Sequence, residues 1–208
     1  MSIFIYLKNT SFFLLTFVFF NISVFGQSEE KELYEGKFAP PFSVKDIDGK
    51  FHSVEKYKGQ KILLSFYRNA SDPISNYRLH ELEAEKEYFK SKNIVLIAVY
   101  ESSLQNLRLL RDTNSFYQLL VADSEGILYE EYGVDEGKER STKGKLNGVG
   151  KKVKEGKKLL STKIIKDKKS KRTGADFLID ENGNIMFAYY SKYHGDSMPI
   201  SLIKEKLN

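Results

Sequence analysis

Three apolar segments alternate with helical patterns in the first two thirds of the chain. Residues 61–68 (KILLSFYR), 93–100 (NIVLIAVY) and 117–123 (YQLLVAD) are nearly continuous apolar runs. Such runs are typical of strands buried on both faces of a sheet. Because helices usually connect strands of this kind in parallel, the order predicts an α/β domain with a largely parallel core.

Antiparallel hairpins are expected before and after that core. Asp48-Gly49 and Asn182-Gly183 favour tight turns, and apolar sequence flanks both. Helices are expected at 73–90, 102–112, 125–133 and 199–207. The inner faces of the first two are assigned to Ile74, Tyr77, Leu82, Ala84, Phe89, Leu104, Leu107 and Leu110. The fold class predicted is a central mixed sheet flanked by helices.

The N-terminus has the order of a secretory signal peptide. Lys8 precedes an apolar run at 12–25 and the small residue Gly26, so residues 1–26 are interpreted as a cleaved leader. The alternative is an uncleaved membrane anchor, although the run is shorter than the ~20 residues that a span needs. We expect an exported protein, periplasmic or secreted, with a linker at 27–35 and one domain at 36–208.

A basic segment interrupts the expected domain at about 137–172. It contains 15 Lys or Arg against 3 Asp or Glu. Leu146, Val149, Val153, Gly156, Leu160 and Ile164 recur at helical spacing, which predicts an amphipathic helix. Its apolar row either packs on its own domain or lies on an anionic membrane surface. Nucleic acid is not expected as a partner, because no aromatic residue interleaves with the lysines.

Four stretches of the sequence resemble the peroxiredoxin-like branch of the alkyl hydroperoxide reductase and thiol-specific antioxidant family. They are GKFAPPFSVKDIDGKFHSV, SFYRNASDPISNYRLHELE, GADFLIDENGNI and YYSKYHGDSMPISLI, in that order between residues 36 and 207. The resemblance implies a thioredoxin-like fold in which the basic helix is an insertion before the C-terminal hairpin. It also implies thiol-dependent peroxidase or antioxidant activity.

The sequence departs from the family at the positions that carry its chemistry. Asp72 and Ser75 stand where the resemblance places the two cysteines, and Gly174 stands where it places a proline that faces the site. The whole chain contains no cysteine. A carboxylate and a hydroxyl cannot follow the oxidation steps of a thiolate. We therefore expect thiol peroxidase activity to be lost, and no cofactor or metal site is predicted.

Residue preferences at helix N-termini and the geometry of the helix bear on the roles of Asp72 and Ser75. Asp is a preferred N-cap residue and Pro73 is favoured at the first helical position, so Asp72 is expected to cap the helix. It would also preserve the negative charge of a thiolate. Ser75 as a nucleophile would need a base, and His80 lies five residues further on, on a different helical face.

Six further positions are candidates for binding at the degenerate site: Arg68, Asn69, Pro73, Arg172, Thr173 and Gly174. Arg68 either pairs with Asp72 or holds an anionic ligand, and the same two roles are open to Arg172. The leading hypothesis is a non-catalytic protein that binds an unknown small molecule or protein there, or a membrane surface through the basic helix. An enzyme of non-thiol chemistry in the same cleft is the alternative. The oligomeric state is open, and a dimer is compatible with the sequence.

Overall fold

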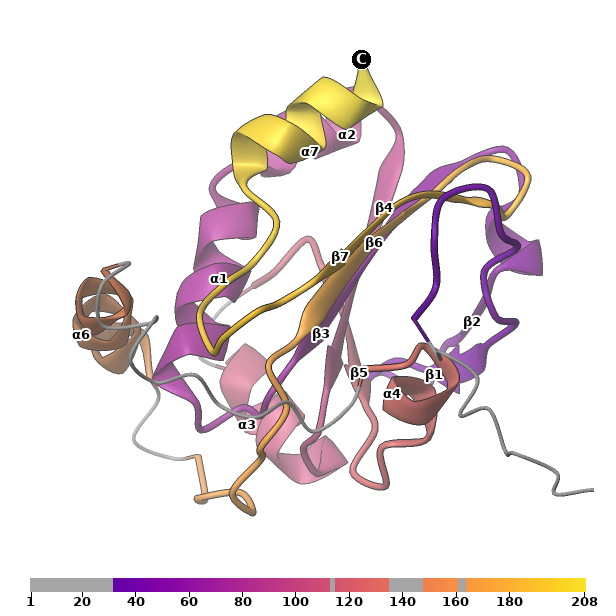
Figure 1. Cartoon of the computed structure of the whole chain (residues 1–208). Helices are drawn as coiled ribbons and strands as arrows, with labels where there is room; N and C mark the ends of the chain where they lie inside the picture. The colour runs from indigo at the N-terminus through magenta and orange to yellow at the C-terminus, as the bar shows by residue number, and fades with distance from the viewer. Residues whose placement is uncertain (1–31, 113–114, 135–147, 161–163) are drawn as a thin grey trace, which may run out of the picture.

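A five-stranded sheet organises the computed structural model, which describes residues 32–112, 115–134, 148–160 and 164–208 (Figure 1). The strands are β3 (Lys61–Tyr67), β4 (Ile94–Tyr100), β5 (Leu119–Ala122), β6 (Ala175–Ile179) and β7 (Ile185–Tyr190). They lie in the order β5-β4-β3-β6-β7. β3, β4 and β5 are parallel, whereas β6 pairs antiparallel with β3 and β7 antiparallel with β6. The predicted mixed sheet is confirmed.

Helices cover both faces of this sheet. They are α1 (Pro73–Glu83), α2 (Lys86–Ser91), α3 (Leu104–Asp112), α4 (Ile127–Glu131), α6 (Val149–Leu159) and α7 (Ile200–Leu207), with a 3₁₀ turn η1 (Glu55–Tyr57). Side chains of β3 alternate between the faces, as the period of a strand requires. Phe66 packs with the aromatic residues of α4, whereas Leu63 packs with α2 and α7 and Tyr67 with α1 and α3.

Both predicted hairpins are present. β1 (Ser43–Lys45) pairs antiparallel with β2 (Phe51–Ser53), and the turn between them contains Gly49 at a φ of 81°. Gly183 has a φ of 91° in the turn between β6 and β7. Glycine adopts positive φ at little cost, which explains why these turns were readable from sequence.

The single helix expected at 73–90 was wrong, because the chain forms α1 and α2 with a break at Ala84 and Glu85. The break redirects the chain so that Phe89, fully buried, packs under the sheet. Ala84 was assigned to the inner face but is exposed. Leu104 was also misassigned, since it is 41% exposed while Leu107 and Leu110 are fully buried.

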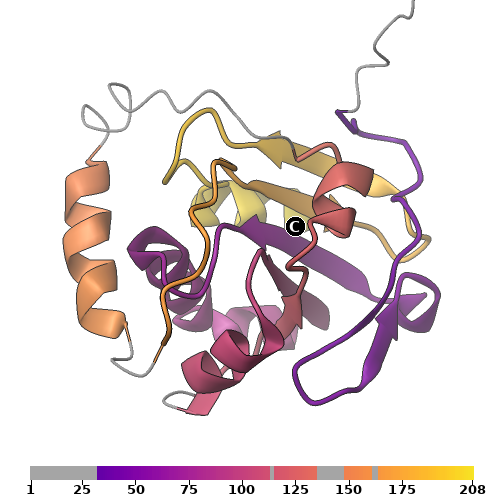
Figure 2. The same ribbon diagram turned by 90° about the horizontal axis from the view of Figure 1, so that it is seen from below.

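α6 is the helix predicted within the basic segment, and it packs on its own domain beside α1 (Figure 2). The expected apolar row ran on to Ile164, but the helix ends at Leu159 and Leu160 is extended, so this part of the prediction was wrong. A Cβ added to Gly156 would lie 1.8 Å from the carbonyl oxygen of Pro73. The two helices therefore approach backbone to backbone at this point. Leu146, the predicted leader and part of the predicted linker lie outside the described residues. Within the described part of the chain, no helix is long and apolar enough to span a membrane.

Candidate functional site

Asp72 caps the N-terminus of α1, as the sequence predicted. Its Oδ2 accepts a hydrogen bond of 2.8 Å from the amide of Ser75, and Pro73 is the first helical residue. An N-cap side chain of this kind satisfies a backbone donor that has no partner within the helix.

The hydroxyl of Ser75 is held from both sides. It donates to Oδ2 of Asp72 at 2.8 Å and accepts from the amide of Arg68 at 3.1 Å. Ser75 is also 3% exposed. Its proton points to an ionised carboxylate that is a poor base, so the arrangement does not favour a serine nucleophile.

His194 contacts the second carboxylate oxygen of Asp72. Its Nε2 lies 3.1 Å from Oδ1 of Asp72, and it comes from the loop between β7 and α7. Burial acts to raise the pKa of Asp72, but the hydrogen bond and charge of His194 and the hydrogen bonds from Ser75 outweigh it, so this pKa is lowered. The lowered pKa favours an anionic Asp72 at the position where the sequence resemblance places a cysteine.

Arg68 and Asn69, which precede the cap, form hydrogen bonds that hold the loop in place. The Nε of Arg68 donates to the carbonyl oxygen of Arg172 rather than to Asp72. Asn69 accepts from the hydroxyl of Ser71 at 2.9 Å, and its Nδ2 lies 3.2 Å from the carbonyl oxygen of Lys168. These contacts tie the loop to the chain that leads into β6.

The predicted residues on that chain divide into two groups. Thr173 and Gly174 line the same pocket as Ser75. Gly174 has a φ of 102° and lies close to β3, because a Cβ added to it would lie 2.8 Å from the carbonyl oxygen of Phe66. The side chain of Arg172 is buried elsewhere. It stacks on Tyr129, 4.8 Å from the ring centroid, and donates to the carbonyl oxygen of Val134.

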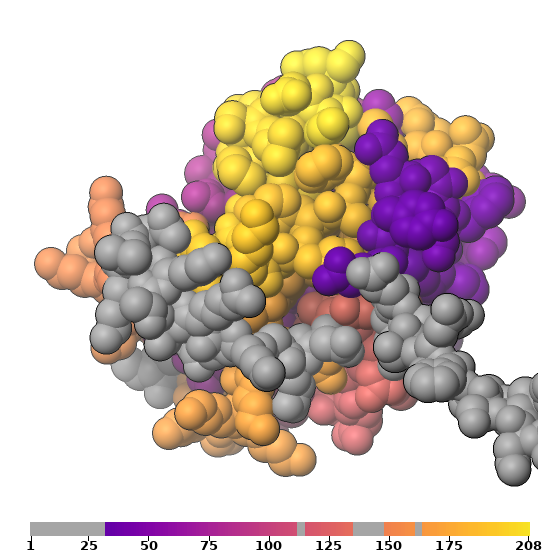
Figure 3. All heavy atoms as spheres, in the orientation of Figure 1, coloured from indigo at the N-terminus to yellow at the C-terminus, as the bar shows by residue number. Residues whose placement is uncertain are grey.

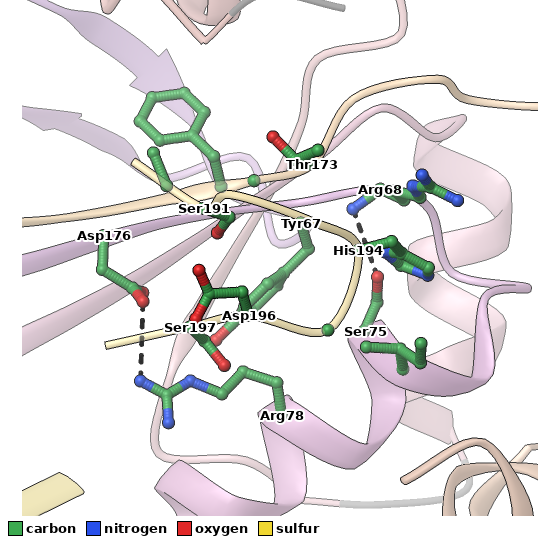
Figure 4. Close-up of a pocket in the computed structure, with 15 residues that line it drawn as sticks. Tyr67, Arg68, Ser75, Arg78, Thr173, Asp176, Ser191, His194, Asp196 and Ser197 are labelled. Atoms are coloured by element: carbon green, nitrogen blue, oxygen red, sulfur yellow. Dashed lines mark hydrogen bonds and ion pairs between the residues drawn. The ribbon is translucent and has the colours of Figure 1, made fainter. Parts of the chain in front are cut away.

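A small pocket opens between the first turns of α1, the start of β6 and the loop before α7 (Figure 4). Its volume is about 30 Å³, which is room for one or two water molecules. Two arginines and two carboxylates line it, namely Arg68, Arg78, Asp176 and Asp196. The positive charges of the two arginines therefore equal the negative charges of the two carboxylates.

The inner wall of the pocket is a buried polar network around Arg78, which is 4% exposed. Arg78 donates to Glu81 at 2.6 Å and to the carbonyl oxygen of Met198 at 2.7 Å, and its Nη2 lies 3.6 Å from Asp176. Asp176 also accepts from the hydroxyl of Ser65 at 2.6 Å. Burial acts to lower the pKa of Arg78, but Asp176, Tyr67 and Glu81 together raise it.

Two polar atoms of this wall lack a hydrogen bond of normal geometry within the described chain: Nε of Arg78, and the hydroxyl of Tyr67, which has only the hydroxyl of Ser65 beside it. Tyr67 is 6% exposed, and Figure 4 shows both side chains extending into the same region beside Asp196. A buried donor without a partner costs free energy, so such atoms mark a place where a further hydrogen bond is favourable.

His194, Arg78, Asp176 and Tyr67 were not among the predicted site residues. A weak sequence signal did point to Arg78 as a site residue. It lies three residues after Ser75, and therefore on the same face of the helix, next to the apolar Leu79. His194 lies in the stretch YYSKYHGD that resembles the family, without a local sign of its partner. The described residues contain no group of three or more histidine or acidic side chains placed to hold a metal ion.

The strand order, the site at the N-terminus of α1 and the strand β6 beside it define a thioredoxin-like protein. The AhpC/TSA family matches residues 36–188, and the chain belongs to that family. A thioredoxin-like protein from Bacillus subtilis (strain 168), YneN, is 29% identical over 101 residues. That match covers 48% of this chain and 59% of YneN, so the chain spans about three fifths of this relative's length.

Solved structures of peroxiredoxins share the fold. Peroxidoxin BcpB from Mycobacterium tuberculosis is 14% identical with a TM-score of 0.60, over 85% of this chain and 95% of that one. A mutant of PrxQ from Xylella fastidiosa is 15% identical with a TM-score of 0.60, over 84% and 93% of the two chains. At these identities the likeness establishes the fold alone.

Proposed function

We propose that this chain is an exported, non-catalytic member of the AhpC/TSA family that binds a small uncharged polar group in the pocket beside Ser75. The observation that carries the loss of catalysis is the pair at the cysteine positions. Asp72 and Ser75 are hydrogen-bonded to each other and to the end of the helix, and neither offers a sulfur for peroxide reduction. The leader at 1–26 supports export.

The binding role is supported by the unpartnered atoms of Tyr67 and Arg78. An uncharged occupant is favoured because Arg78 is already offset by Glu81 and Asp176. An extra anion or cation would leave an unbalanced charge at this buried position. The small volume admits one or two heavy atoms, such as the polar end of a larger molecule.

Peroxide consumption tests the catalytic half. The purified protein, supplied with a thiol reductant, should consume hydrogen peroxide no faster than a heat-denatured sample. A clear rate above that background would overturn the proposal. The double variant Asp72→Cys with Ser75→Cys is the companion experiment: a regained rate would indicate that the scaffold retains the remaining requirements of the reaction.

Tyr67→Phe tests the binding half, and the test works whatever the ligand is. If the hydroxyl of Tyr67 has a bound partner, its removal should destabilise the protein by about 1 kcal/mol. If the pocket is empty, removal of an unpartnered hydroxyl should be neutral or stabilising. Tyr100→Phe is the matched control, because the hydroxyl of Tyr100 is also buried and unpartnered among the described residues but does not line the pocket. A high-resolution crystal structure would then identify the occupant, and water alone would overturn the binding proposal.

A further inference from the structure

The apolar side of α6 packs against its own domain. Gly156 lies against the backbone of Pro73, and a Cβ at Gly195 would meet the methyl groups of Val149 at 3.1 Å. The ammonium of Lys152 donates to the carbonyl oxygen of Gly195 at 2.8 Å. The opposite side of α6 presents four exposed lysines: Lys151, Lys154, Lys157 and Lys158.

Hydrogen bonds hold the 164–171 segment after α6 against the domain, and the carboxylate of Asp167, its one acidic residue, is turned inward. Asn106 bonds both backbone groups of Ile165, and Asp167 accepts from Nδ2 of Asn106 at 2.7 Å and from the hydroxyl of Ser102 at 2.9 Å. The amide of Asp167 lies 3.3 Å from the hydroxyl of Ser71. Lys166, Lys168 and Lys169 are left exposed, and the side chain of Ile165 is 60% exposed among them.

These seven exposed lysines form what we call the basic face. Residues 148–160 and 164–171 contain nine lysines against two acidic residues, whereas the rest of the described chain has a net charge of −4. Glu155 pairs with Lys158, and Asp167 is turned inward. Figure 3 shows α6 and the 164–171 segment, both orange, protruding from the body of the molecule.

We propose that the basic face docks on an anionic lipid surface, with Ile165 at the boundary between headgroups and acyl chains. Clustered lysines attract anionic lipids, and an exposed apolar side chain among them adds burial in the interface. Nucleic acid fits less well, because residues 148–160 and 164–171 contain no aromatic side chain on which a base would stack. The inference does not depend on the proposed function of the pocket.

Docking would also orient the degenerate site. The 164–171 segment is bonded to Asn69 and Ser71, and α6 packs on Pro73. Both parts of the basic face therefore adjoin the loop that leads into α1. The end of the molecule that carries the pocket would lie near the lipid surface.

Cosedimentation with vesicles of phosphatidylcholine, alone or with about 30% phosphatidylglycerol, tests the proposal on the purified full chain. The apolar run at 12–25 would contribute equally to both vesicle types, so the informative quantity is the difference between them. Binding to the anionic vesicles should be stronger and should weaken as salt rises from about 0.05 M to about 0.5 M. Equal binding to both vesicle types would overturn the proposal.

Charge-reversal variants locate the interaction. Lys154→Glu with Lys157→Glu, and Lys166→Glu with Lys168→Glu, should each reduce the anionic-vesicle partition coefficient about tenfold or more. Lys50→Glu with Lys58→Glu changes the net charge equally, on exposed residues outside the basic face, and should reduce it much less.

Three outcomes would count against the proposal. Equal losses in the control and the basic-face variants would show that only net charge matters, and would overturn the docking site. Ile165→Ser should weaken binding without changing its salt dependence, whereas unchanged binding would remove Ile165 from the interface. A short RNA duplex that binds the basic face more tightly than the vesicles would replace the lipid surface as the partner.

Discussion

The cap of α1 and the turn that follows it satisfy their polar groups in different ways. At the cap, Asp72 is bonded to Ser75 and His194, and Gly156 brings α6 into backbone contact with Pro73. One turn further along α1, Arg78 is buried with Asp176, and its Nε has no hydrogen-bond partner within the described chain.

This difference locates what the site retains. Asp72 and Ser75, the predicted cysteine positions, form the cap, where their hydrogen bonds are made within the chain. Around Arg78, unused hydrogen-bonding capacity remains in a pocket of about 30 Å³ that Ser75 also lines. Because the cap and the Arg78 region satisfy their polar groups differently, substitutions in each should have effects of different size.

Arg78→Ala should have the largest effect. It leaves the carboxylate of Asp176 buried without its cation, which costs about 3–5 kcal/mol when one partner of a buried ion pair is removed. Thermal unfolding of the purified variant measures the loss. Lys90→Ala is the control, because it breaks an exposed ion pair with Glu87 and should change the melting temperature little. Equal shifts in the two variants would show that the buried contacts of Arg78 contribute no more than a surface contact.

Gly156→Ala should have the next largest effect. The added Cβ would collide with the carbonyl oxygen of Pro73, so α6 must move away from α1, at a cost of about 1–3 kcal/mol. Gly150→Ala is the matched substitution in the same helix, where nothing lies within 4 Å of the new Cβ. It should stabilise the protein by about 0.5–1 kcal/mol through helix propensity. If both variants gain stability, the close contact between the helices is absent in solution.

The fold was predictable because its signals are local. The apolar runs predicted β3, β4 and β5, and Gly49 and Gly183 predicted the two hairpin turns. The break between α1 and α2 was not predictable in this way. Helical periodicity continues through Ala84, and only the need to bring Phe89 under the sheet ends the helix there.

The site was predictable only in part. Asp72, Ser75 and Arg68 lie at a strand end and a helix start, so their positions followed from the elements themselves. His194 reaches Asp72 from 122 residues further along the chain. Arg78 reads from sequence as a solvated helix charge, and its burial depends on partners such as Asp176 from β6. Arg172 was assigned to the site by position, yet its side chain packs on Tyr129.

Asp72→Ala should have a smaller effect than the changes at Arg78 and Gly156. Loss of the cap costs about 1 kcal/mol, and His194 and Ser75 lose their shared partner as well. Asp72→Asn separates the two contributions, because Asn caps a helix about as well as Asp but carries no charge. Chemical denaturation should therefore rank the unsubstituted protein above Asp72→Asn, and Asp72→Asn above Asp72→Ala. Equal stability of the two variants would show that the cap hydrogen bond contributes nothing.

The pH dependence of the Asp72→Asn effect should be the smallest signal and the most specific one. The folded state lowers the pKa of Asp72, so the ionised carboxylate stabilises the fold above its unfolded pKa of about 3.9. That stabilisation is lost as the pH falls through the lower folded pKa, where Asp72 becomes protonated and its charge interaction with His194 ends. The difference in unfolding free energy between the two proteins should thus be present at neutral pH and shrink toward about pH 2. Comparing the two proteins at each pH cancels the other carboxylates with lowered pKa values, such as Asp46 and Asp180. A difference that stays constant across this range would mean that the charge of Asp72 does not stabilise the cap of α1.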